Sequence, residues 1–338
     1  MKRRAVIEEA VGETRAAVYE GKRIAELHTW RWSDKAKPRA GDIFSGRITR
    51  IEKSLAAAFV DLGHGPDGFL KFSNAPGAPR LTEGKYIHVR ITRDAEPGKG
   101  PVLKFVDIAE DNFKGPIKHT TLETFLAQRF AGLTIDKAAV NIIEEAVQTE
   151  IAIKGGGSIS IERTRALTAI DVDKGHANSG FDVSLAAAQL IAMQLRLRGL
   201  GGLFVIDFPN LRQAKQREKL FDEVTTAFEG DTEAIKIAPI SRFGTMEMTR
   251  AKTRLSLDET LCDAYGHPTV ETRALMALRR LEREGRASGG AKLTLTVAED
   301  VYAWLSADNI AWQEEMTRRL GARYTVKSGD SLTVDVDR

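Results

Sequence analysis

The chain has 338 residues, of which 42% are apolar and 29% are charged, and its formal net charge is only +3. This length allows two or three domains, the composition is that of an ordinary soluble protein, and the mildly basic balance alone does not indicate a nucleic-acid partner. No run approaches the ~18–20 apolar residues of a membrane span. The single cysteine, Cys262, excludes a disulfide within the chain, and no apolar stretch follows the basic residues 1–4, so a cytoplasmic location is expected.

The first part of the chain predicts β-structure. Residues 1–36 are expected to contain two short strands, and residues 37–112 to form a separate domain with five strands punctuated by glycine and proline. Five short strands over such a length predict an OB-type β-barrel. The expected barrel strands are 42–51, 56–63, 67–70, 86–92 and 101–105.

The remaining chain predicts a mixture of helices and strands. Residues 113–155 are expected to be a helical segment, with helices at 121–130 and 135–150. Residues 156–267 alternate strand and helix, which is typical of an α/β layered domain. Residues 268–338 are expected to form a small α+β domain with helices at 271–284 and 299–306 and strands at 293–297 and 332–336. The predicted fold class is therefore α/β within an α+β multi-domain chain.

Two apolar runs in the expected α/β domain each end in a carboxylate. The first ends with Asp171 and Asp173, and the second ends with Asp207. Side chains two apart on a strand share a face, so the three carboxylates can converge at one sheet edge if the two strands are neighbours. Such carboxylates repel each other unless a cation lies between them, and an all-oxygen site suits Mg²⁺ or Mn²⁺. Hydrolysis of a phosphodiester is the chemistry expected there, and the competing interpretation is strand-end carboxylates that cap a helix.

The order of several motifs resembles the ribonuclease E/G family. The stretches 156–162, 163–173, 194–207 and 240–244 resemble its catalytic domain, and the stretches 46–51 and 57–61 resemble its S1 domain, an OB-fold RNA binder. Residues 1–36 and 113–155 would then be parts of a reduced ribonuclease-H-like subdomain.

The resemblance implies an endoribonuclease, a hydrolase that cleaves single-stranded RNA with bound Mg²⁺ and leaves a 5′-phosphate on the downstream product. It assigns the catalytic and metal-binding roles to Asp171 and Asp207. The family has asparagine where this chain has Asp173, so an added carboxylate could act as a further metal ligand or slow product release. The expected partner is single-stranded RNA, from ribosomal or transfer RNA precursors or messenger RNA.

The resemblance also indicates residues that contact RNA. Phe59 and Phe69 fall where S1 domains carry stacking aromatics, and Lys99 falls at a basic position; barrel-core phenylalanines are the competing interpretation. Arginine can pair a phosphate bidentately. The arginines expected to do so are Arg242, Arg196 and Arg198, and helix-end cations or internal ion pairs are their competing interpretation.

Two departures from the family pattern limit what the resemblance implies. The family links its subunits through a Cys-x-x-Cys zinc site, but the matching stretch ends in Tyr265 instead of a second cysteine, so zinc is not expected and a homodimer would not be linked by zinc. Residues 113–155 are too few for the insert that holds the family's 5′-end sensor, so the sensor is expected to be absent and cleavage rates to be similar for different RNA 5′ ends.

Two other functions remain open from the sequence. The chain could be a non-catalytic protein that binds RNA or ribosomal particles, derived from the same scaffold, or a nuclease that acts on a different substrate such as DNA. The retained aspartates favour catalysis over binding alone.

Overall fold

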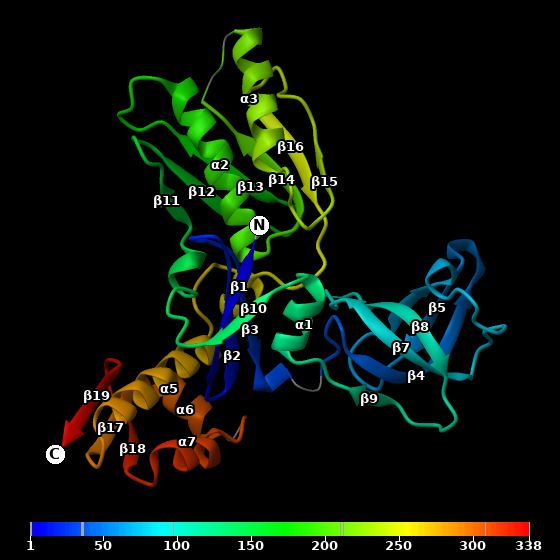
Figure 1. The fold of residues 1–338 in the computed structure, drawn as a ribbon, viewed down its shortest axis with the longest axis vertical. Helices are drawn as coiled ribbons and strands as arrows, with labels where there is room; N and C mark the ends of the chain where they lie inside the picture. The colour runs from blue at the N-terminus through cyan, green and yellow to red at the C-terminus, as the bar shows by residue number, and fades with distance from the viewer. Residues whose placement is uncertain are drawn as a thin grey trace.

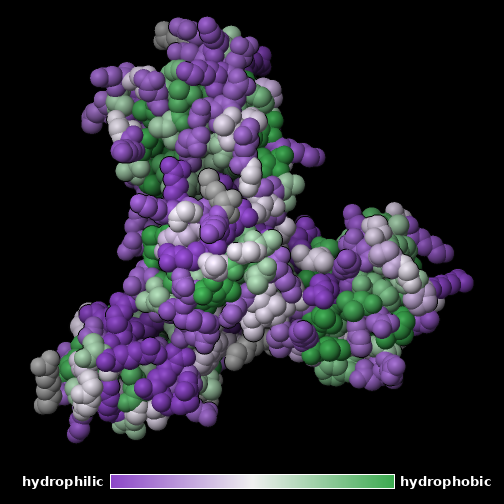
Figure 2. Space-filling view, viewed as in Figure 1, coloured by the Kyte–Doolittle hydropathy of each residue, from purple (hydrophilic) through white to green (hydrophobic). Residues whose placement is uncertain are grey.

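The computed structural model describes residues 2–34, 37–96, 98–209, 211, 213–307 and 309–337. Three lobes extend from a central sheet (Figure 1). The face shown in Figure 2 is largely hydrophilic on the α/β and C-terminal lobes and carries a hydrophobic patch on the barrel lobe. The mixture of sheets, helices and a closed barrel confirms the predicted fold class. In the described part of the chain, no helix is both long enough and apolar enough to cross a membrane.

The central sheet brings together two segments that are distant in sequence. Its strand order is β10-β1-β2-β3, in which β1–β3 are antiparallel and β10 is parallel to β1. Helix α1 packs Leu122, Leu126 and Phe130 against one face of the sheet. The bounds are β1 Arg3–Ala10, β2 Glu13–Glu20, β3 Arg23–Arg31, α1 Leu122–Arg129 and β10 Thr134–Lys137.

The expected helix at 135–150 was wrong. Its first residues form strand β10, and only a short 3-10 turn at Glu145–Val147 follows before strand β11. The alternation of Ile135 with polar neighbours suits a strand, and the unpaired edge of β1 supplies its hydrogen-bonding partner.

The barrel contains the five expected strands. It closes because β5 pairs with both β6 and β4, and Phe44 and Ile48 lie in its core with the other inward-facing residues. A sixth strand, β9, adds to the outside edge of β4, so the sheet extends past the expected boundary at residue 112. The bounds are β4 Ile43–Glu52, β5 Ala57–Asp61, β6 Gly68–Lys71, β7 Tyr86–Arg93, β8 Val102–Ile108 and β9 Gly115–Lys118.

The α/β lobe is a six-stranded sheet with the order β11-β12-β13-β14-β16-β15. Strands β13 and β14 are parallel, joined through α2, which lies beside α3 over the sheet (Figure 1). Their apolar faces form one buried core. The bounds are β11 Glu150–Ala152, β12 Ser158–Arg163, β13 Thr168–Asp173, α2 Gly180–Arg198, β14 Gly202–Asp207, α3 Ala214–Ala227, β15 Ile235–Ile237 and β16 Thr245–Arg250.

The C-terminal lobe follows the short helix α4 and contains two elements that the sequence interpretation did not predict, α7 and β18. Its sheet has the order β18-β17-β19. Buried Arg279 on α5 pairs with Glu13 and Glu144 and so fastens this lobe to the central sheet. The bounds are α4 Leu257–Leu261, α5 Val270–Ala287, β17 Lys292–Val297, α6 Glu299–Ser306, α7 Trp312–Leu320, β18 Tyr324–Ser328 and β19 Thr333–Asp337.

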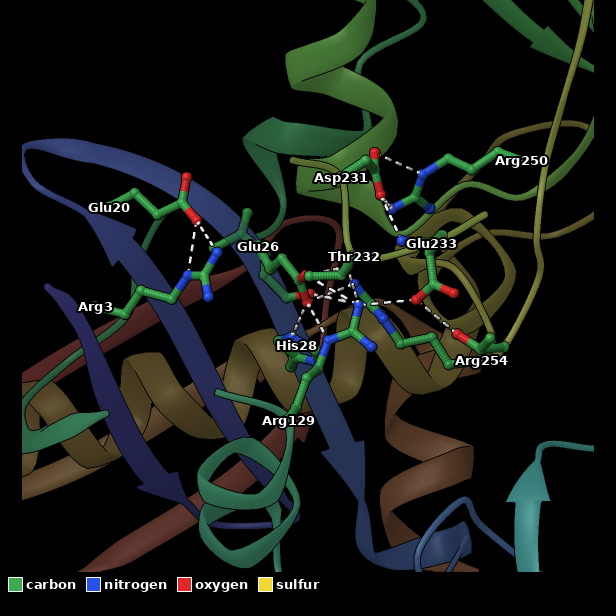
Figure 3. A network of polar contacts seen from close by, with 12 residues as sticks. Arg3, Glu20, Glu26, His28, Arg129, Asp231, Thr232, Glu233, Arg250 and Arg254 are labelled. Atoms are coloured by element: carbon green, nitrogen blue, oxygen red, sulfur yellow. Dashed lines mark hydrogen bonds and ion pairs between the residues drawn. The ribbon is translucent and has the colours of Figure 1, made fainter. Parts of the chain in front are cut away.

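A buried polar network joins the central sheet to the base of the α/β lobe (Figure 3). Glu26 on β3 accepts hydrogen bonds from His28 at 3.0 Å and from Arg129 at 3.1 and 3.2 Å, and Arg254 lies 3.5 Å from it. Arg129 also donates to Glu233 at 2.8 Å. We refer to Glu26, His28, Arg129, Glu233 and Arg254 as the junction network.

Candidate functional site

Two aspartates lie side by side at the carboxyl ends of parallel strands. Asp171 on β13 and Asp207 on β14 are direct register partners, and both are solvent-exposed. The side chains therefore leave neighbouring backbones at the same level of the sheet, as expected if the two strands are adjacent. Among the described residues neither carboxylate forms an ion pair, although the Val172 amide is hydrogen-bonded to Asp171.

Asp173 lies one step farther along the same face of β13. Two residues of strand span about 6.6 Å, so it is beyond the level of Asp207. Its Oδ1 accepts a hydrogen bond of 2.9 Å from the Gly175 amide in the turn that follows. The part of the chain that the structure describes contains no group of three or more His, Cys, Asp or Glu residues placed to hold a metal. The geometry therefore pairs Asp171 with Asp207 and places Asp173 farther along, as the last residue of β13. The expected role of Asp173 as a further metal ligand stays a prediction.

The charge on this edge of the sheet is unbalanced. Although Asp171 is open to solvent, partial burial of its carboxylate, followed by the negative charges of Asp207 and Asp173, raises its pKa above the usual value. A cation held between Asp171 and Asp207 would remove this repulsion. Mg²⁺ is commonly bound through one or two carboxylates together with water and substrate phosphates, so the donor set fits this ion.

Arg242 lies at the same edge of the sheet. Its turn connects β15 to β16, and Thr245 at the start of β16 is the register partner of Asp207. The Arg242 side chain is exposed, with its guanidinium carbon 4.8 Å from the centre of the Phe243 ring. The structure thus places the turn that carries Arg242 at the same edge of the sheet as the carboxylate pair, and the expected contact with substrate stays a prediction.

Arg196 and Arg198 lie at the opposite end of the lobe. They are in the last turn of α2. The N-terminus of this helix follows β13, near the sheet edge that carries the aspartates, and the helix contacts β3 of the central sheet. Arg198 is only 1% exposed and is held by Gln194, Asp258 and the carbonyl of Gln148. The expectation that Arg198 contacts RNA was therefore wrong, because its charge is used inside the protein.

Arg196, in the same helical turn as Arg198, is half-buried, and its Nε lies buried without a hydrogen-bond partner among the described residues. Its position away from the carboxylate pair does not support the expected RNA contact. The sequence shows both arginines as basic residues at a helix end, and it does not show that the helix end is docked on another sheet.

The barrel gathers its expected RNA-binding residues in one hollow. Phe59 and Phe69 are register partners on β5 and β6, with ring centres 5.6 Å apart, and they line a hollow of 480 Å³ together with exposed Lys99. Both rings are half-buried, so part of each is open to solvent. This hollow lies on a different lobe from the carboxylate pair (Figure 1).

Two arginines of the same hollow were missed by the sequence interpretation. Arg50 is the register partner of Phe59, and its guanidinium carbon lies 4.3 Å from the ring centre. Arg93 also lines the hollow, and its Nε has no hydrogen-bond partner among the described residues. Side chains of β4 point alternately toward and away from the barrel core, and this alternation could have identified Arg50 as an outward-facing residue.

Cys262 lies at the end of α4, half-buried. Burial, followed by the negative charges of Asp258 and Asp263, raises the pKa of its thiol. Since zinc binds the thiolate, this environment gives no support to a zinc site, and the absence of a zinc link stays a prediction.

Comparison with known proteins extends these observations. Residues 91–253 match the sequence profile of the ribonuclease E/G family. These residues are a ribonuclease E/G family domain. They contain the carboxylate pair, Lys99 and Arg242, so the predicted family resemblance is confirmed.

Similar proteins include Ribonuclease E of Escherichia coli, which is 35% identical over 205 residues, covering 56% of this chain and 19% of that protein. Ribonuclease G of Escherichia coli is 34% identical over 143 residues, covering 39% of this chain and 29% of that protein. A chloroplastic Ribonuclease E/G-like protein of Arabidopsis thaliana is 37% identical over 154 residues, covering 42% of this chain and 15% of that protein. In each case the match spans less than a third of the relative.

Proposed function

We propose that this protein is a metal-dependent endoribonuclease that cleaves single-stranded RNA and leaves a 5′-phosphate on the downstream product. The observation that carries the proposal is the register pairing of Asp171 with Asp207 at the carboxyl ends of two parallel strands, within a ribonuclease E/G family domain. Neither carboxylate forms an ion pair among the described residues, and a bound cation would relieve the repulsion between them.

The residues at this edge have separate roles in the proposal. Asp171 and Asp207 hold Mg²⁺, and Mn²⁺ suits the same donor set. When bound, the metal supplies a water of lowered pKa and positive charge beside the phosphate oxygens. Arg242 contacts a phosphate oxygen of the RNA strand that is cleaved, to which its guanidinium can donate two hydrogen bonds.

The barrel holds the RNA at a distance from the cut. Bases stack on Phe59 and Phe69, and such stacking contributes about 1–3 kcal/mol for each base. Lys99, Arg50 and Arg93 add positive charge around the rings. Because the hollow and the carboxylate pair lie on different lobes, the substrate must be a flexible strand long enough to reach both. Binding through these cations should weaken steeply as salt is raised.

The decisive experiment is cleavage of an end-labelled, AU-rich single-stranded RNA. Wild type is compared with Asp207→Asn, each in Mg²⁺ and in EDTA, with DNA of the same sequence as a second substrate. Asp222→Asn is the matched control, because Asp222 is an exposed aspartate in the middle of α3. We expect internal cuts in RNA that require both Mg²⁺ and Asp207, and full activity in the control.

The other outcomes separate the competing functions. RNA binding without cutting, unchanged in Asp207→Asn, would overturn the proposal and leave a non-catalytic RNA-binding protein. Equal cutting of DNA would contradict the RNA specificity. Cutting that persists in EDTA would contradict the metal dependence, and cutting that persists in Asp207→Asn would place the chemistry elsewhere in the molecule.

A further inference from the structure

An exposed aromatic ring stands at the edge that carries the carboxylate pair. Phe243 lies in the turn between β15 and β16, and 77% of its surface is exposed. Burial of a phenylalanine side chain stabilises a fold by about 1.5–3 kcal/mol, and the exposed Phe243 ring does not contribute this stabilisation. Phe243 is absent from the buried cores, although Ile240 at the start of the same turn packs against one of them.

The position of the turn is fixed relative to Asp207. Thr245, immediately after the turn, is the register partner of Asp207. On the other side, a Cβ placed on Gly244 would lie 3.7 Å from the carbonyl oxygen of Phe208, the residue that follows Asp207. These two contacts place the turn directly beside the end of β14.

The turn is also internally hydrogen-bonded. The Ser241 amide donates to the Thr245 carbonyl at 2.8 Å, and the Gly244 amide donates to the Ser241 carbonyl at 3.1 Å. The Phe243 amide donates to the Ser241 hydroxyl at 3.2 Å, and that hydroxyl lies 2.8 Å from the Thr245 hydroxyl. Gly244 has a φ of +93°, which other residues rarely adopt. The ring is therefore presented by a defined turn.

We propose that Phe243 is a stacking platform for an unpaired base of the RNA strand beside the phosphate that is cut. This inference rests on the proposed function and adds a substrate contact to it. Arg242, whose guanidinium lies against the ring, reaches the backbone phosphate of the same nucleotide. Because every base has a π-face, the platform tolerates any sequence, but it requires a base that is free of pairing. It would therefore select single-stranded segments at the site of the cut.

The test measures base stacking in the absence of cutting. In an Asp207→Asn background, short AU-rich RNAs carry one 2-aminopurine at successive positions, and its fluorescence falls when the base stacks. We expect quenching at one position that depends on Phe243. Phe243→Ala and Phe243→Leu should abolish this quenching and weaken RNA binding about 5- to 150-fold, whereas Phe243→Tyr should retain both.

The control is Tyr265→Ala. Tyr265 is 85% exposed in the turn after α4, away from the carboxylate pair, and its removal should change neither quenching nor affinity. Circular dichroism of each variant verifies folding, and light scattering measures its oligomeric state.

Each outcome decides one of the two proposals. An unchanged quenching profile and affinity in Phe243→Ala would overturn the platform, whether or not wild type cuts RNA. Loss of self-association in Phe243→Ala without a change in RNA binding would also overturn it and assign the ring to contact with a second copy. Phe243-dependent quenching in a protein that does not cut RNA would retain the platform and reject the nuclease.

Discussion

The junction network and the carboxylate pair are two concentrations of charge with opposite environments. At the junction, Glu26 is buried, and burial alone would raise its pKa. The hydrogen bond from His28 and the charges of Arg254 and Arg129 outweigh burial and lower the pKa well below its usual range. At the carboxylate pair, partial burial and then the like charges of Asp207 and Asp173 raise the pKa of Asp171, and no cation among the described residues offsets them.

This difference separates structural charge from charge that is available to a ligand. Glu26 contacts His28, Arg129 and Arg254, which come from three segments of the chain. Its ionised form therefore helps to hold the central sheet to the α/β lobe. Asp171 and Asp207 are exposed and hold nothing together among the described residues. Removing a charge should therefore weaken the fold at the junction and leave it intact at the carboxylate pair.

The largest effect is expected from Glu26→Gln. The substitution keeps the shape of the side chain but leaves Arg129 and Arg254, which are mostly buried, without the charge of Glu26. Removing one partner of a buried ion pair costs about 3–5 kcal/mol. We expect this loss in the free energy of unfolding, measured by urea denaturation.

The matched control for that variant is Glu20→Gln. Glu20 pairs with Arg3 at 2.7 Å, but both side chains are about a quarter or more exposed, at 26% and 30%. A pair of this kind contributes about 0–1 kcal/mol. Equal losses in the two variants would contradict the distinction between the junction and the surface.

A smaller effect is expected from pH. Burial, and then the charge of Arg254, lowers the pKa of His28 to about 4, although its hydrogen bond to Glu26 opposes this shift. The unfolded chain binds a proton at the ordinary pKa of 6.5, so between these values the unfolded state holds more protons than the folded state. Stability is therefore complete above pH 6.5 and falls as the pH is lowered toward 4, by about 3 kcal/mol.

Hydrogen exchange of the β3 amides at pH 7, 6, 5 and 4 measures this loss at the junction, after correction for the intrinsic exchange rate. His28→Gln retains a donor for Glu26 and removes the titrating group, so its stability should change much less over the same range. A wild-type profile that is flat between pH 6.5 and 4 would show that His28 does not titrate with the predicted shift.

How well these two regions could be predicted from sequence depends on how far apart in the chain their interacting residues lie. Asp171 lies near the end of β13 and Asp207 at the end of β14. A single crossover helix joins these strands, and the local sequence pattern was enough to predict that the two aspartates lie together. Glu26 and Arg129 are 103 residues apart, and their pairing depends on how α1 docks on the sheet. No local pattern distinguishes Glu26 from an exposed glutamate on a strand.

The same reasoning explains individual errors. Arg198 and Arg242 both follow apolar segments in a family-like motif, and only the packing of α2 against the central sheet shows that Arg198 is buried. Strand β10 was mistaken for a helix because its strand character depends on the edge of β1, which lies far away in sequence. The expected barrel strands were found because each is paired with neighbours that are near in sequence or separated by short turns.

The smallest effect concerns metal and stability at the carboxylate pair. Mg²⁺ that binds the folded state should raise the free energy of unfolding, by about 1 kcal/mol when its concentration is several times the dissociation constant. Asp171→Asn removes one ligand and one of the repelling charges, so without metal it should be as stable as wild type or slightly more stable, and Mg²⁺ should no longer stabilise it. Thermal unfolding of wild type and Asp171→Asn in EDTA and in Mg²⁺ measures both effects.

Asp222→Asn should respond to Mg²⁺ as wild type does, because removal of that carboxylate leaves the pair intact. A variant Asp171→Asn that is destabilised in EDTA as strongly as Glu26→Gln would mean that Asp171 is a structural charge after all.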